Sequence, residues 1–254
     1  MRHARIRHHG KVVNVSVDEQ LRVTLPDGSV LNELDAEWLP PAQGTVFALG
    51  LNYADHASEL EFKAPEEPLV FLKAPNTLTG HRQVSVRPAD VEYMHYEAEL
   101  VAVIGKTARN VSRENAMDYV AGYTLCNDYA IRDYLENYYR PNLRVKSRDT
   151  LTPIGPYIVD RDDIADPHRL ALSTYVNGEL RQRGSTADMI FDIPYLISYL
   201  SEFMTLQPGD MIATGTPKGL ADVLPGDEVM VEIEGIGRLV NHIISEKDYE
   251  ESLR

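Results

Sequence analysis

Three carboxylates, Glu97, Glu99 and Asp128, have the types and spacing to hold one hard metal ion. Glu97 and Glu99 open a run whose β-branched residues and closing Gly105 predict a buried strand over 97–105. Side chains two residues apart on a strand point to the same face, so both carboxylates face one way. Asp128 follows a second apolar run, 119–126, where that strand should end. Carboxylates without Cys or His partners favour Mg²⁺, Mn²⁺ or Ca²⁺ over zinc. The alternative is a solvated strand end and an ordinary turn aspartate.

A His–Glu pair upstream has the chemistry for proton transfer. The residues after Asp55 predict a short helix with Asp55 as its N-cap. His56 and Glu59 are three positions apart and would be neighbours on one helical face. A histidine titrates near the operating pH and a carboxylate can orient its ring, so the pair suits general acid–base catalysis. A plain surface contact would show the same spacing.

Positive charge is concentrated directly after Asp128. Five basic residues fall between positions 132 and 148, namely Arg132, Arg140, Arg144, Lys146 and Arg148. Arginine suits bidentate binding of carboxylates, and lysine can stabilise a developing oxyanion as a compact charge. We therefore expect Arg132 and Lys146 to face a substrate. The roles of the other three arginines stay open, and a solvated basic loop is the alternative.

The elements that must position these residues are mostly short strands joined by turns. Residues 10–31 alternate around Pro26-Asp27-Gly28 and predict a small hairpin region. Asn177-Gly178 predicts a type I′ hairpin. Two Pro-Gly-Asp turns, at Pro208 and Pro225, each precede a strand-like run.

One longer helix is predicted over 194–204. Its apolar stripe is expected to face the core and consists of Leu196, Ile197, Leu200, Phe203 and Met204. Pro40-Pro41 predicts a boundary between a small N-terminal β region, residues 1–44, and a catalytic domain, residues 45–254.

The composition excludes several classes of function. The chain has 254 residues, of which 43% are hydrophobic, enough for a sizeable core. A net charge of −14 argues against nucleic acid or an anionic membrane as a partner. No apolar run approaches the ~18 residues of a membrane span, and no apolar leader follows the first residues. The single cysteine, Cys126, is expected to be a small buried residue in a reducing compartment, so we expect a cytoplasmic protein.

Five motifs in order resemble the fumarylacetoacetate hydrolase family. They are the Asn-Tyr-x-Asp-His-Ala-x-Glu stretch at 52–59, the Glu-x-Glu strand at 97–99, the Asn-Asp-Tyr-x-x-Arg-Asp turn at 127–133, the Lys-x-x-Asp element at 146–149 and the Gly-Thr-Pro-x-Gly loop at 215–219. The resemblance spans about residues 45 to 245. It implies an α+β fold with a mixed β-roll and a divalent metal, Mg²⁺ or Mn²⁺, held by Glu97, Glu99 and Asp128.

Three further segments, 71–80, 134–143 and 202–206, are similar to an isomerase/decarboxylase branch of this family. This resemblance implies decarboxylation of 5-carboxymethyl-2-oxo-hex-3-ene-1,7-dioate and isomerisation of 2-hydroxyhepta-2,4-diene-1,7-dioate in 4-hydroxyphenylacetate (homoprotocatechuate) catabolism. The candidates for binding this 2-oxo di- or tricarboxylate are Arg132, Thr216 and Lys73. Enzymes of this branch are tandems of two homologous halves, whereas this chain has one. We therefore expect a homodimer, or pairing with a homologous N-terminal-half subunit.

The implied reaction assigns a role to each candidate catalytic residue. The 2-oxo acid would chelate the ion, and charge would develop on its C2 oxygen, where Lys146 could share it. His56 with Glu59 would move the proton that isomerisation requires. Residues 59–68 are rich in charge and are expected to form a lid over bound substrate.

Two other functions remain open at this point. The first is hydrolytic C–C cleavage of acylpyruvates or related β-diketo acids, with His56 and Glu59 activating water. The family turn often has a Gln three residues after its Arg, where this chain has Leu135, which mildly favours the non-hydrolytic branch. The second is a non-catalytic subunit that scaffolds a homologous partner, which the intact carboxylates and acid–base pair disfavour.

Overall fold

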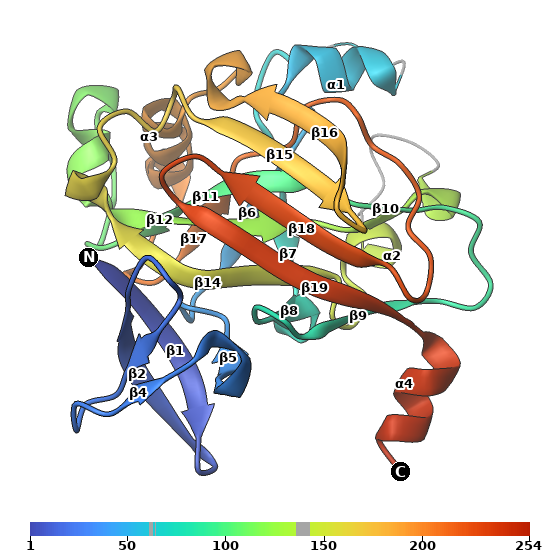
Figure 1. Ribbon diagram of the computed structural model, residues 1–254. Coiled ribbons are helices and arrows are strands. Elements are labelled where there is room, and N and C mark those ends of the chain that lie inside the picture. The colour runs from blue at the N-terminus through green and yellow to red at the C-terminus, as the bar shows by residue number, and fades with distance from the viewer. Residues whose placement is uncertain (61–62, 64, 136–142) are drawn as a thin grey trace.

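Two β-sheets packed face to face form the body of the protein, with few helices around them (Figure 1). The computed structural model describes residues 1–60, 63, 65–135 and 143–254. Within these residues the sheets are mixed or antiparallel and the helices are short, so the fold is α+β as predicted. No helix in the described part of the chain has both the length and the apolar character needed to cross a membrane.

The larger sheet contains twelve of the described strands. The order along its main path is β4 (Val30–Leu31), β3 (Val23–Thr24), β2 (Lys11–Val17), β1 (Arg2–His8), β14 (Thr152–Asp160), β12 (Val120–Asn127), β11 (Ala98–Ile104), β17 (Met211–Ala213), β6 (Val46–Gly50) and β7 (Leu69–Lys73). Off this path, β5 (Glu37–Leu39) pairs with β1, and β8 (Leu78–Thr79) pairs with β14. Because β17 runs antiparallel to β11 but parallel to β6, the sheet is mixed.

The second sheet covers one face of the first. Its order is β16 (Glu179–Ser185), β15 (Ala171–Val176), β18 (Glu228–Ile233), β19 (Gly237–Ser245) and β9 (Val84–Arg87). A two-stranded ladder joins β10 (Met94–His95) to β13 (Ala130–Ile131). Between the sheets, Leu100 and Ala102 of β11 share one apolar cluster with Leu172 of β15 and Val231 of β18. Burial of this apolar area is what holds the two sheets together.

Among the described residues, four α-helices and several 3₁₀ turns accompany the strands, and the last helix follows the final strand, β19. The helices are α1 (Ala54–Glu59), α2 (Leu143–Lys146), α3 (Ile193–Phe203) and α4 (Glu246–Ser252). The 3₁₀ turns span Glu33–Asp35, Pro75–Thr77, Arg113–Tyr119, Arg132–Tyr134, Arg161–Asp163 and Thr186–Asp188. Both α1 and α2 carry residues of the candidate site described below.

Strand β11 is buried along its whole length, which explains its nearly continuous apolar sequence. Its even-numbered residues face the core between the sheets, whereas Val101 and Val103 belong to a second apolar cluster on the opposite face. With a side-chain period of two, Glu97 and Glu99 extend the row of Val101 and Val103. The predicted strand over 97–105 is therefore confirmed, with its bounds at Ala98–Ile104.

Predicted turns agree well with the observed ones. Asn177 and Gly178 join β15 to β16 with positive φ angles of 52° and 80°, as a type I′ turn requires. The Pro-Gly-Asp turns at Pro208 and Pro225 precede β17 and β18. Cys126 is fully buried, also as expected.

Helix α3 begins one residue earlier than predicted, because Asp192 is the N-cap and accepts a hydrogen bond from the backbone N–H of Tyr195. Three members of the predicted stripe, Leu196, Ile197 and Leu200, are buried. The prediction for Phe203 is wrong: its side chain is 58% exposed and packs edge-on against Tyr199. The fifth member, Met204, is partly buried and packs against the core.

The predicted N-cap of the short helix α1 is also wrong. Tyr53, in an extended conformation, occupies the N-cap position, and Asp55 lies in the first turn. There the Asp55 carboxylate accepts a hydrogen bond from the backbone N–H of His56 at 2.8 Å. Tyr53 is fully buried, and its carbonyl accepts the first intrahelical hydrogen bond, from the backbone N–H of Ala57 at 3.0 Å.

The N-terminal strands form a lobe at one end of the molecule (Figure 1). The predicted turn at Pro26-Asp27-Gly28 does connect β3 to β4, but the longer hairpin is β1–β2, which turns at His9–Gly10. Strand β1 then pairs antiparallel with β14, so the lobe continues the large sheet. The division into residues 1–44 and 45–254 stays a prediction.

Candidate active site

Three buried carboxylates meet at the end of the β11–β12 ladder. One oxygen from each of Glu97, Glu99 and Asp128 lies within 4.8 Å of the others. Their exposed fractions are 5%, 0% and 1%. Asp128 reaches this position because β12 runs antiparallel to β11 with Ala98 opposite Asn127, and the backbone N–H of Asp128 donates to the carbonyl of Glu97 at 2.9 Å. The three side chains therefore converge, as the sequence predicts.

Glu99 is the member of this cluster whose charge is least compensated. Burial, and then the charges of Asp128 and Glu97, raise the pKa of its carboxyl well above the ordinary value. Its Oε2 accepts a hydrogen bond from the backbone N–H of Gly215 at 2.9 Å. Its Oε1 has no hydrogen-bond partner among the described residues. A buried, repelled carboxylate with a free oxygen is an arrangement that a divalent cation would stabilise, so the residues fit a metal site.

Two lysines compensate the charge of Asp128. Lys146 Nζ lies 2.9 Å from Asp128 Oδ2 and 2.5 Å from Glu97 Oε2. Lys73 Nζ lies 2.6 Å from Asp128 Oδ1 and also donates to the carbonyl oxygen of Lys146. Burial opposes the charge of Lys146, but the neighbouring carboxylates Asp128 and Glu97 prevail and raise its pKa.

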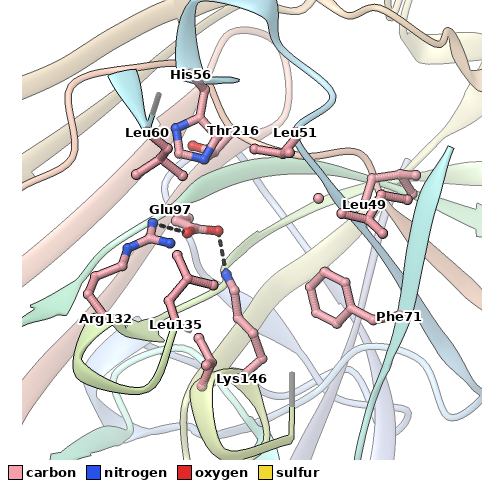
Figure 2. Close-up of a pocket in the computed structure, with 13 residues that line it drawn as sticks. Leu49, Leu51, His56, Leu60, Phe71, Glu97, Arg132, Leu135, Lys146 and Thr216 are labelled. Atoms are coloured by element: carbon pink, nitrogen blue, oxygen red, sulfur yellow. Dashed lines mark hydrogen bonds and ion pairs between the residues drawn. The ribbon is translucent and has the colours of Figure 1, made fainter. Parts of the chain in front are cut away.

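Arg132 compensates the other oxygen of Glu97. Its Nη2 lies 2.5 Å from Glu97 Oε1, opposite the contact that Lys146 makes, as the dashed lines in Figure 2 show. Burial opposes ionisation of Glu97, yet the charges of Lys146 and Arg132 lower its pKa below the ordinary value. With Lys73, these residues give three cationic side chains against three carboxylates.

His56 and Glu59 lie together on α1 as predicted. His56 Nδ1 is 3.4 Å from Glu59 Oε2, and Glu59 Oε1 accepts from the backbone N–H of Gly219 at 3.0 Å. The Glu59 carboxylate can only accept a hydrogen bond, so Nδ1 of His56 must be the donor. The lone pair on His56 Nε2 is then available to take up a proton. Burial lowers the pKa of His56, so the ring is neutral near pH 7 and can act as a base.

A pocket with two chemically different ends adjoins this cluster (Figure 2). Its polar lining consists of His56, Glu97, Arg132, Lys146 and Thr216. Its apolar lining includes Leu49, Leu51, Leu60, Leu69, Phe71, Leu135 and Val145. Such a cavity suits a small molecule with charged oxygens at one end and a hydrocarbon chain at the other.

The model of the family "Fumarylacetoacetate (FAA) hydrolase C-terminal" matches residues 45–244. This chain belongs to the fumarylacetoacetate hydrolase family. It is 78% identical over 209 residues to the 4-hydroxyphenylacetate degradation bifunctional isomerase/decarboxylase of Escherichia coli, a match that covers 82% of this chain and 49% of that protein. The chain thus spans about half the length of the curated relatives that it matches first.

Solved structures of the fumarylacetoacetate hydrolase fold superpose closely on this chain. The 5-carboxymethyl-2-hydroxymuconate delta-isomerase of Mycobacterium smegmatis has a TM-score of 0.85 at 36% identity, covering 97% of this chain and 99% of that one. Maleylpyruvate hydrolase of Sphingobium sp. SYK-6, solved with manganese(II) and pyruvate, has a TM-score of 0.82 at 29% identity, covering 96% and 99%. These likenesses confirm the predicted fold.

The remaining candidate residues from the sequence occupy several different places. Lys73 is predicted to contact substrate, but the described pocket lining does not include it, and its ammonium is bound to Asp128 instead. Arg144 and Arg148 stack on the ring of Tyr134, with Cζ 3.7 and 5.1 Å from its centroid. Arg140 lies outside the described residues, as do positions 61, 62 and 64 of the predicted lid.

Two residues in the site carry polar contacts that sequence reasoning missed. Asn52 donates to the carbonyls of Thr214 and Phe191 at 2.8 and 3.0 Å, and so ties the loop after β17 to the start of α1. Gln182 on β16 donates to Thr216 at 2.8 Å. Asn52 opens a recognisable motif, but a single glutamine in a short strand gives no signal of its own.

Proposed function

We propose that this chain is a divalent-metal-dependent enzyme that decarboxylates 5-carboxymethyl-2-oxo-hex-3-ene-1,7-dioate and isomerises 2-hydroxyhepta-2,4-diene-1,7-dioate. The pathway would be 4-hydroxyphenylacetate catabolism. The observation that carries the proposal is the buried triad of Glu97, Glu99 and Asp128, with its free Glu99 oxygen, at the polar end of a pocket. The high identity to the bifunctional relative supports the substrate class.

The proposed metal ligands are Glu97, Glu99 and Asp128, and the ion would be Mg²⁺ or Mn²⁺, which both accept oxygen ligands. When bound, the ion would supply a Lewis acid that stabilises negative charge on a 2-oxo oxygen. The manganese in the related maleylpyruvate hydrolase is consistent with this choice.

The protein's own side chains divide the remaining work. Lys146 Nζ, already among the carboxylates, would stabilise enolate charge at the substrate's C2 oxygen. Arg132 and Thr216 line the same end of the pocket and would bind substrate carboxylates. His56, neutral and oriented by Glu59, would take and return the proton in isomerisation. The apolar lining would hold the unsaturated chain and exclude water.

An ultraviolet time course tests this function. The substrate 5-carboxymethyl-2-oxo-hex-3-ene-1,7-dioate is added with Mg²⁺, and again with excess chelator. We expect metal-dependent release of CO₂, with a conjugated diene that rises and then decays. A protein that binds no divalent ion would instead favour a non-catalytic partner subunit.

Hydrolytic C–C cleavage is a second candidate, because maleylpyruvate hydrolase has the same fold and the His56–Glu59 pair could activate water. Leu135, at the position where the family turn often has a glutamine, lines the pocket, and its hydrocarbon side chain cannot orient water, which mildly favours the non-hydrolytic branch. Pyruvate release from acylpyruvates, with no turnover of the hexenedioate, would assign the chain to this branch.

We also propose that this chain associates with a second copy of itself or with a homologous subunit. A homodimer, or a complex with a homologous N-terminal half, would bring two homologous domains together and match the length of the longer proteins. Sedimentation velocity of the purified chain tests this directly. A monomer that is fully active would contradict it.

A further inference from the structure

A buried glutamine outside the pocket reaches one of its lining residues. Gln182 lies on β16, the edge strand of the second sheet, yet its side chain is only 1% exposed because it points toward the loop after β17. Its Nε2 donates to Thr216 Oγ1 and to the carbonyl oxygen of Pro217, both at 2.8 Å. Its Oε1 accepts from Thr174 Oγ1 at 2.8 Å and from the backbone N–H of Ala98 at 3.4 Å.

Two backbone groups fix which end of this amide is which. The carbonyl of Pro217 can only accept, so the atom that contacts it must be the NH₂ group of Gln182. The N–H of Ala98 can only donate, so the atom that contacts it must be the amide oxygen. A flipped amide would set oxygen against oxygen and N–H against N–H in a buried site. The orientation therefore follows from chemistry and not from an arbitrary choice.

The fixed amide determines how Thr216 can hydrogen-bond. The Thr216 oxygen accepts from Gln182 Nε2, and its own hydroxyl proton has no acceptor among the described residues. Thr216 is 2% exposed and lines the polar end of the pocket. Its proton therefore has a free direction toward the pocket, where it can be given to a ligand.

Tight packing prevents the loop from turning Thr216 away. A Cβ at Gly184 would overlap the ring of Pro217, so the Pro217 ring packs directly on the backbone of β16. Gly219, with φ +102°, lies so close to Gln182 that an added Cβ would be 3.3 Å from its Cα. The loop is also tied at Gly219 by Glu59 and Tyr96. This contact between the two sheets holds the donor in place.

We propose that Gln182 is a positioning residue that fixes the Thr216 hydroxyl as a hydrogen-bond donor into the pocket. The Thr216 hydroxyl then offers its proton to a ligand that presents a carboxylate or carbonyl oxygen. The inference rests on the proposed function for the ligand class, a 2-oxo acid, and on hydrogen-bond chemistry for the role of Gln182.

The first test measures the affinity of the Mg²⁺-loaded protein for pyruvate by calorimetry. Thr216→Val and Gln182→Leu should each weaken pyruvate binding by about tenfold to a hundredfold, the effect of losing one hydrogen bond to a charged group. The double variant should bind no more weakly than Thr216→Val alone, because Gln182 acts through that hydroxyl. Thr216→Ser keeps the hydroxyl and should bind pyruvate within a few-fold of the unchanged protein.

Thr174→Val is the matched control, since it removes a buried hydroxyl from the far end of the same amide and leaves Nε2 with both of its acceptors. Its affinity for pyruvate should stay within about twofold of the unchanged protein. Losses that add in the double variant, or unchanged binding in Gln182→Leu, would overturn the inference.

Neutron diffraction of a deuterium-exchanged crystal tests the same inference without any ligand. The Thr216 deuteron should point into the pocket, and both amide deuterons of Gln182 should point to Thr216 and Pro217. A Thr216 deuteron directed at Gln182 would overturn the positioning role. If the deuterons lie as expected but pyruvate does not bind, only the proposed 2-oxo acid function fails.

Discussion

Lys73 Nζ lies 2.6 Å from Asp128 Oδ1, and both side chains are 1% exposed. The pair links the end of β7, where Lys73 lies, to the turn after β12, where Asp128 lies. Its burial means that each charge relies on the other, because water cannot replace a lost partner. Lys73 therefore supports the carboxylate cluster from outside the pocket.

Replacing this lysine should destabilise the protein more than it changes substrate contacts. Lys73→Met leaves Asp128 buried with one fewer cation, and removal of one partner from a buried ion pair costs about 3–5 kcal/mol. Urea unfolding in chelator measures this loss. Lys63→Met is the control, because Lys63 is 84% exposed in its ion pair with Glu66 and should change stability by less than about 0.5 kcal/mol. Equal stability of the two variants would contradict this role.

Glu99→Gln should have opposite effects with and without metal. In chelator the neutral amide relieves repulsion from Glu97 and Asp128, so the unfolding temperature should rise. With Mg²⁺ at 100 times its dissociation constant, the unchanged protein should gain about 2.7 kcal/mol, and the variant should lose most of this gain. Differential scanning fluorimetry checks both conditions, with exposed Glu228→Gln as the control. A metal-dependent shift that persists in Glu99→Gln would argue against this ligand set.

His56→Ala should separate the two proposed activities. Isomerisation requires proton transfer and should fall by about 10²- to 10⁴-fold. Decarboxylation depends instead on stabilising the negative charge that develops on the C2 oxygen, so it should fall less. Stopped assays that quantify CO₂ and the isomerised dienoate give the two rates. Glu97→Ala, in contrast, should abolish both. Equal losses in His56→Ala would refute this division of labour.

A network far from the pocket predicts acid sensitivity. Glu33 accepts hydrogen bonds from buried His81 and from Arg82, and these partners, His81 first, lower its pKa to about 2 from 4.5. His81 also accepts from the backbone N–H of Val240, and burial lowers its pKa. Both groups are depressed in the folded state, so their stabilisation is present above the unfolded pKa values and is lost as pH falls.

Urea unfolding at several pH values between 7 and 3 measures this dependence. The free energy of unfolding should begin to fall below pH 6.5 through His81 and fall more steeply below pH 4.5 through Glu33. Glu33→Gln should remove the part of the slope below pH 4.5, and Glu19→Gln, at an 80% exposed position, should not. Identical slopes for all three proteins would count against the network.

Much of the candidate site follows from local rules. Glu97 and Glu99 share a face because strands have a period of two, and Asp128 joins them because the next strand along the chain is the antiparallel partner. His56 and Glu59 meet because α1 is a helix. Each of these relationships joins residues that are close in the sequence or that lie on consecutive strands, so the sequence pattern is enough to predict it.

The contacts that could not be predicted join distant parts of the chain. Gln182 reaches Thr216 only because β16 packs against the loop after β17, and neither element indicates the other. Lys73 meets Asp128 because the chain after β7 returns through β8, which pairs with β14, the neighbour of β12 in the sheet. Phe203 fits the helical period of the core stripe, yet its side chain is exposed whereas the neighbouring Met204 packs against the core. Long-range packing decides such cases, and periodicity carries no information about it.

The equal numbers of carboxylates and cationic side chains around Asp128 have a thermodynamic consequence. With all three carboxylates ionised the cluster is formally neutral, so a divalent cation leaves it with two uncompensated positive charges. A substrate with two or more carboxylates restores neutrality in this poorly hydrated space. We expect the ion and the dianion to bind cooperatively, each raising the affinity of the other by the same factor. The empty protein would then hold its ion weakly, and a multiply charged substrate would secure it.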